Sequence, residues 1–335
     1  MKSEAKTSFK GLFDRQIGYW FRGIAIIMVI LSHYAEWWSW FLPTEGAAEE
    51  FRLTLTKLGV YGVNIFFLFS GYGLTKAAEG KRIDGHFILR RMQSVYLPYL
   101  IIVGIIDMLS GGFSSFSDFV KFLYGGDYWF MVILFLFYIG FMLIWAVVKN
   151  KHLRFLLFLA YTFALVKALF DREMQSFWYV SNLAFVLGII MGTYEKDCIR
   201  IPSVVKALVI PLCLAFTIYY ELYMDKAGMT PEQILNLQMV NTVLWTIQIA
   251  CIAALIPWHD RIFARLGRCS LYLYLLHTYI FMQCVNFLQC DVPLRIAIAA
   301  AVTVVTAIVC ELLVTSLFKL ASRNRKSDSK ARSVS

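Results

Sequence analysis

Long apolar runs that recur along the whole chain constrain its fold more than any other feature. Ten such runs, bounded by charged or turn-forming residues, cover roughly 18–40, 58–78, 93–110, 128–148, 153–170, 177–194, 203–222, 239–257, 270–289 and 294–318. A helix needs about 20 mostly apolar residues to cross the hydrocarbon core of a bilayer. Charged residues make up only 16% of the 335 positions, against about 25% in soluble proteins. We therefore predict an all-α polytopic membrane protein with about ten transmembrane helices.

The positions of lysine and arginine predict how these helices are oriented. If the N-terminus lies inside the cell, 25 of the 32 basic residues fall in the two terminal segments and in alternate loops on the inner side. Cytoplasmic loops are enriched in Lys and Arg. Both termini are therefore expected in the cytoplasm. The net charge of +10 then reflects topology and contact with an anionic leaflet, and no nucleic-acid partner is needed to explain it.

The charge pattern also predicts the domain organisation. We expect a cytoplasmic N-terminal segment at 1–17, one transmembrane domain at 18–320 and a basic cytoplasmic tail at 321–335. The seven cysteines are scattered, mostly within apolar runs, and none forms a C-x-x-C pair. Cysteine in such runs behaves as a small hydrophobe. We predict no metal site, and the oligomeric state stays open.

The first apolar run carries ionisable residues that are costly inside a bilayer. Arg22 and His33 are eleven residues apart, which on a helix places them on one face with a rise of about 16 Å. Arg22 would lie near the inner boundary and His33 just beyond the midplane. Glu36 follows one turn later, close enough to orient the imidazole. Arg22 alone could be a membrane anchor, but a mid-span histidine on the same face favours a functional site.

Two further runs carry polar residues with two interpretations each. Asn64 lies at about the depth of His33, followed by Ser70 and Tyr72 in the segment S-G-Y-G. The glycines would either loosen the helix beside a cavity or allow close packing of another helix. His277, about 10 Å into the ninth run, would either tie two helices together or move a proton.

An arginine pair and an aromatic residue complete the candidates. Arg90 and Arg91 precede the third run, where they could clamp phosphates or anchor the helix at the membrane surface. Trp129 opens the fourth run, and its default role would be in the aromatic belt at the outer face.

Taken in order, these segments resemble the acyltransferase-3 family of membrane proteins. The pattern R-x10-H from Arg22 to His33 is followed by F-F-L-F-S-G-Y, by F-I-L-R-R before Pro98 and by S-L-Y-L-Y-L-L-H ending at His277. The likeness extends over essentially the whole chain. One departure is Ser94, where many members have a further arginine.

The resemblance implies a ten-helix enzyme of the inner membrane that uses acyl-CoA, most often acetyl-CoA, as its donor substrate, with no permanently bound cofactor. The acceptor would be a hydroxyl of a glycan or of a lipid-linked saccharide. In the family the histidine matching His33 is thought essential. The arginines matching Arg22, Arg90 and Arg91 are implicated in donor handling, and Ser94 leaves the donor contacts open.

A mechanism derived from the residues alone agrees with the acyl transfer that the resemblance implies. Acyl transfer to a hydroxyl needs a base and groups that stabilise an oxyanion. His33 would be the base, oriented by Glu36 or another carboxylate, while Asn64, Ser70, Tyr72, Trp129 and His277 would bind substrate or support the fold. The alternative is a transporter or flippase for a polysaccharide precursor, because transporters also place polar residues and broken helices at mid-membrane.

Overall fold

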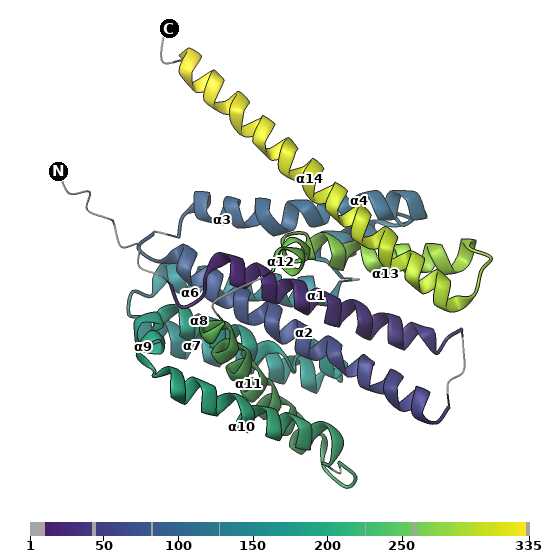
Figure 1. Cartoon of the computed structure of the whole chain (residues 1–335). Helices are drawn as coiled ribbons and strands as arrows, with labels where there is room; N and C mark the ends of the chain where they lie inside the picture. The colour runs from purple at the N-terminus through teal and green to yellow at the C-terminus, as the bar shows by residue number, and fades with distance from the viewer. Residues whose placement is uncertain are drawn as a thin grey trace, which may run out of the picture.

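The computed structural model describes residues 11–41, 45–81, 83–126, 128–224, 226–256 and 260–332, with side chains up to residue 317 except that of Met92. Every regular element in these ranges is a helix, and the long helices form one bundle (Figure 1). The all-α prediction is confirmed. The long helices are α1 (Arg15–Trp38), α2 (Ala47–Ala78), α4 (Leu97–Ser110), α6 (Trp129–Val147), α7 (Lys151–Asp171), α8 (Asn182–Thr193), α10 (Ser203–Leu222), α11 (Pro231–Leu255), α13 (Ser270–Phe287) and α14 (Val292–Arg332).

Shorter helices connect or extend these. They are α3 (Gly85–Arg91), the π-helix η1 (Met92–Tyr96), α5 (Phe116–Tyr124), the 3-10 turn η2 (Ser176–Trp178), α9 (Glu195–Arg200) and α12 (Arg261–Arg268). The third span therefore runs continuously from Gly85 to Ser110, eight residues earlier than the expected start at 93. Pro98 cannot donate a backbone hydrogen bond, and the π-helical turn ends two residues before it, at Tyr96.

Nine helical segments of the described ranges are long and apolar enough to cross a membrane. The chain is thus a polytopic membrane protein, while the side on which each terminus lies stays a prediction. The segment expected at 270–289 forms α13, which is not among the nine. Tyr272, Tyr274 and His277 make it less apolar, and all three are buried, so that they contact other helices rather than lipid.

Glycines allow the closest helix contacts at the centre of the bundle. A Cβ on Gly71 of α2 would lie 2.2 Å from the carbonyl oxygen of Phe185, and one on Gly188 of α8 would lie 2.2 Å from that of Leu68. Small residues let the backbones of membrane helices touch in this way. Helix α2 continues unbroken through Gly73, where a Cβ would have nothing within 4 Å, so only Gly71 of the two glycines makes a close helix contact.

A second close contact holds α12 against α1. A Cβ on Gly23 would lie 2.0 Å from the carbonyl oxygen of Phe263, and one on Gly267 would lie 1.7 Å from that of Tyr19. Neither position has room for a larger residue without a shift of the backbone. This contact brings the basic helix α12 to the Arg22 end of α1.

Helix α5 folds back along the third span. The hydroxyl of Tyr99 donates to the carbonyl of Phe122 at 2.6 Å, and that of Tyr96 donates to the carbonyl of Leu123 at 2.8 Å. Tyr99 precedes the end of α4 at Ser110 by eleven residues, or about 16 Å of helix. The end of α5 therefore lies well within the bundle, and α6 begins there.

Candidate functional site

His33 and His277 form a pair between α1 and α13. Nδ1 of His33 lies 2.6 Å from Nε2 of His277. Their ring planes differ by only 8°, with centroids 4.9 Å apart, so the hydrogen bond lies close to the ring planes. His277 is 1% exposed, and its Nδ1 lies 2.6 Å from the carbonyl oxygen of Tyr274.

These contacts assign the tautomers of both rings when they are neutral. A carbonyl oxygen can only accept, so Nδ1 of His277 carries a proton and its Nε2 carries a lone pair. Nδ1 of His33 then donates to that lone pair. Nε2 of His33 is left with a lone pair of its own, which suits a proton acceptor.

Glu36 does not occupy the place expected for it beside His33. The ring nitrogen that a carboxylate would orient is bonded to His277 instead, and Glu36 is exposed. The orienting partner therefore comes from a helix 244 positions away in sequence. His277 therefore links two helices through a hydrogen bond, which was one of the two roles expected for it, and this hydrogen bond also orients the ring of His33.

His33 lines a cavity of about 580 Å³, called here the outer cavity because it extends from His33 away from Arg22. Its walls come from α1, α2, α4, α6, α13 and the segment before α8. They include His277, the aromatic residues Trp37, Tyr128, Trp129, Phe177 and Tyr274, and the carboxylates Glu36 and Asp107. Trp129 is thus a lining residue of this cavity.

Arg22 and Arg91 line a second cavity of about 830 Å³ at the other end of α1, called here the inner cavity. Arg22 also donates to the carbonyl of Phe69 at 3.3 Å. Ser70, Tyr72 and Ser94 are further lining residues. Five basic side chains outnumber two carboxylates in its walls: Arg15, Arg22, Lys76, Arg91 and Arg268 against Asp14 and Glu195.

Only one layer of side chains separates the two cavities. Val29, Val63 and Tyr274 line both of them. Tyr274 also supplies the carbonyl that holds His277. The histidine pair therefore lies at the boundary between a basic cavity and an aromatic, acidic one.

Two expected site residues lie outside both cavities. Arg90 is exposed and lines neither, whereas its neighbour Arg91 does. Asn64 is 1% exposed, and within the described part of the chain neither of its amide atoms has a hydrogen-bond partner. It lies on α2 two turns before Gly71, on the face that packs against α8.

Glu195 closes one wall of the inner cavity through a network of hydrogen bonds. Its carboxylate accepts from Lys76 at 2.7 Å, from the backbone N–H of Leu12 at 2.8 Å and from the hydroxyl of Tyr72. Burial acts to raise the pKa of Glu195, but these hydrogen bonds outweigh it and the pKa lies below its usual value. The network ties the segment at 11–14 to α2 and α9.

Several lining residues were missed in the sequence. Arg268 follows Arg261 and Arg265 in one basic segment. The sequence alone could therefore have marked it as a candidate for the basic cavity. Asp107 is a carboxylate within an apolar run, which was equally visible. Within the described residues, no group of three or more His, Cys, Asp or Glu side chains could hold a metal ion.

The site and the bundle define a polytopic membrane protein with a histidine pair between two cavities. The sequence profile of the acyltransferase-3 family, described as an acyltransferase domain, matches residues 19–314. The chain belongs to this family and is a membrane acyltransferase, which confirms the resemblance. No curated protein matches the chain significantly, nor does any solved structure.

Proposed function

We propose that the protein transfers an acyl group, most simply acetyl, from acyl-CoA to a hydroxyl of a glycan or lipid-linked saccharide. The observation that carries this proposal is the position of His33. Its ring is held by His277 at the boundary between a basic cavity and an aromatic one. A transporter without chemistry would not account for membership of an acyltransferase family.

The inner cavity suits the donor. Coenzyme A carries several phosphates, which arginine binds through charge-assisted hydrogen bonds. Arg22 and Arg91 line this cavity, and Arg268 and Arg15 extend its positive charge. Arg22 and His33 are separated by about 16 Å along α1, a distance that the extended pantetheine arm would bridge to bring its thioester to the histidine.

The proton transfer then needs only groups at the histidine pair. Nε2 of His33 takes the proton from the acceptor hydroxyl as the oxygen attacks the thioester carbonyl. The carbon–sulfur bond breaks, and the coenzyme A thiolate leaves and takes up that proton. The Nδ1–H of His33 remains bonded to His277, which stabilises the ring while it is positively charged.

The charge pattern of the loops favours a cytoplasmic position for the basic cavity, and acyl-CoA is made in the cytoplasm. The acceptor would then enter from the outer face of the inner membrane. Acyl groups would cross the membrane during transfer without movement of coenzyme A.

The test uses purified protein with labelled acetyl-CoA and the glycan fraction of the cell envelope. Wild type should release free coenzyme A and transfer label to glycan, and His33→Gln should do neither, although it still binds acetyl-CoA. Full activity of a correctly folded His33→Gln protein would show that the base lies elsewhere. Absence of any transfer by wild type would contradict the proposed function.

A further inference from the structure

The proposed transfer needs a group that the histidine pair does not supply. When the acceptor oxygen attacks the thioester, the carbonyl oxygen becomes negatively charged, and enzymes place N–H or O–H groups where that charge develops. One ring nitrogen of His33 is bonded to His277, and the other takes the proton of the acceptor hydroxyl. A further N–H or O–H group must therefore lie where the two cavities meet.

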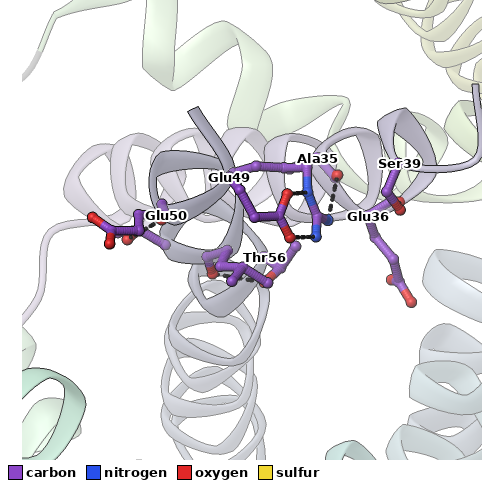
Figure 2. Close-up of polar contacts among 9 residues, drawn as sticks. Ala35, Glu36, Ser39, Glu49, Glu50 and Thr56 are labelled. Carbon is purple, nitrogen blue, oxygen red and sulfur yellow. Dashed lines mark hydrogen bonds and ion pairs between the residues drawn. The ribbon is translucent and has the colours of Figure 1, made fainter. Parts of the chain in front are cut away.

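Cationic side chains do not meet this need in the outer cavity. No lysine or arginine is among its described lining residues. Arg52 of α2 lies against α1, but its guanidinium donates to both oxygens of Glu49, at 2.6 and 2.7 Å, and to the carbonyl of Ala35 at 3.2 Å (Figure 2). An uncharged hydrogen-bonding group is left to meet the developing charge.

Tyr274 is the polar residue at the boundary between the cavities. Of the three described residues that line both, Val29 and Val63 are apolar, whereas Tyr274 carries a hydroxyl. Tyr274 is 9% exposed, and among the described residues nothing accepts a hydrogen bond from its hydroxyl. Buried O–H groups normally have an acceptor, so this one points to a ligand that supplies it.

Packing fixes where this hydroxyl lies. The ring of Tyr274 lies 5.3 Å from that of Phe130 and 5.9 Å from that of His277, measured between centroids. The backbone N–H of Phe130 also interacts with the phenol oxygen. Phe130 belongs to the first turn of α6, where N–H groups have no acceptor within the helix and form the positive end of its dipole. A hydroxyl whose oxygen accepts from such a group donates more strongly itself.

We propose that Tyr274 is a catalytic residue, and that its hydroxyl donates a hydrogen bond to the thioester carbonyl oxygen as that oxygen becomes negatively charged. This inference rests on the proposed function, because the thioester must reach the boundary from the inner cavity. The hydroxyl keeps its proton throughout. The electron pair that moves onto the carbonyl oxygen re-forms the double bond when the carbon–sulfur bond breaks. Tyr274 and His33 thus act on different atoms, the carbonyl oxygen and the acceptor hydroxyl.

The test removes the hydroxyl alone. Tyr274→Phe keeps the ring and the backbone carbonyl that holds His277. Its kcat for acetyl transfer to envelope glycans should fall about 100-fold or more, whereas KM for acetyl-CoA and the melting temperature should stay close to those of wild type. Tyr272→Phe is the matched control and should keep full turnover, because Tyr272 is also buried on α13 but lines neither cavity. Unchanged kcat in Tyr274→Phe, or an equal loss in Tyr272→Phe, would overturn the inference and leave the proposed function standing.

A spectroscopic measurement separates a direct hydrogen bond from an indirect effect on the fold. His33→Gln protein should bind acetyl-CoA without using it, so an isotopically labelled thioester carbonyl can be followed by infrared difference spectroscopy. In this background the carbonyl stretch should lie at lower frequency with Tyr274 than with Tyr274→Phe, because a hydrogen bond weakens the carbon–oxygen double bond. Identical frequencies would contradict the inference. No transfer by wild type would contradict the proposed function, and the inference with it.

Discussion

At the scale of single residues, His277 orients His33 through one accepted and one donated hydrogen bond. A glutamine at this position can donate its amide N–H to the carbonyl of Tyr274 and accept from Nδ1 of His33 with its oxygen. Phenylalanine can do neither. We expect His277→Gln to retain much of the turnover and His277→Phe to lose most of it, with KM for acetyl-CoA unchanged in both.

The measurement is kcat and KM for each variant at equal amounts of folded protein, judged by melting curves. His33→Ala is the reference for complete loss of the base, which typically costs about 10²–10⁴ in rate. Equal turnover in His277→Gln and His277→Phe would mean that the histidine pair does not position the base.

Arg90 and Arg91 form a matched pair for donor binding. Arg91 lines the inner cavity, and Arg90 is exposed outside it. Loss of a charge-assisted hydrogen bond to phosphate should weaken binding of acetyl-CoA about tenfold or more in Arg91→Gln. Arg90→Gln should stay within about twofold of wild type in calorimetric titrations. Similar losses in both variants would contradict the placement of the donor.

At the scale of helices, the contact between α2 and α8 predicts opposite effects of the same substitution two residues apart. A Cβ on Gly71 would meet the carbonyl oxygen of Phe185 at 2.2 Å, whereas one on Gly73 would have nothing within 4 Å. Alanine is about 0.5–1 kcal/mol better than glycine within a helix. Gly73→Ala should therefore melt at or above the wild-type temperature, and Gly71→Ala clearly below it. A wild-type melting temperature for Gly71→Ala would show that these backbones are not in contact.

The segment before α1 is held to α2 and α9 by Glu195, which predicts how stability depends on pH. The folded-state pKa of Glu195 is lowered, so its stabilising contribution is complete above the unfolded value of about 4.5. It is lost as the pH falls below that value through the folded-state pKa. Glu195→Gln should be less stable at neutral pH, and its melting temperature should fall less on acidification.

The control for this prediction is Glu79→Gln. Glu79 also contacts Lys76, but it is exposed, and exposed ion pairs contribute little. Its melting temperature should follow that of wild type across the pH range. If Glu195→Gln did so too, the hydrogen bonds at Glu195 would not stabilise the fold.

At the scale of the whole molecule, local periodicity explains what the sequence could predict. The shared face of Arg22 and His33 follows from helical geometry, and the apolar runs mark helices whose ends lie within a few residues of those expected in most cases. The partner of His33 could not be predicted in this way. It depends on α13 packing against α1 across 244 positions, which no local pattern encodes.

The same limit applies to the outer cavity. Glu36 was expected to orient His33 because it lies one helical turn away. Residues of other helices can form that hydrogen bond too, and His277 does so. Trp129 was placed at the membrane surface because it opens an apolar run. That it also lines the outer cavity depends on the inward fold of α5, which no local pattern shows.

The central claim is that His33 acts as the base for transfer of an acyl group from a donor in the inner cavity to an acceptor in the outer cavity, with donor and acceptor entering from opposite sides of the membrane. The most direct test places labelled acetyl-CoA on one side of sealed vesicles and an impermeant glycan acceptor on the other. Wild type should label the glycan only when acetyl-CoA is on the side of Arg91, and His33→Gln should label none. Labelled glycan only when both substrates share one side, or undiminished labelling by His33→Gln, would contradict the account.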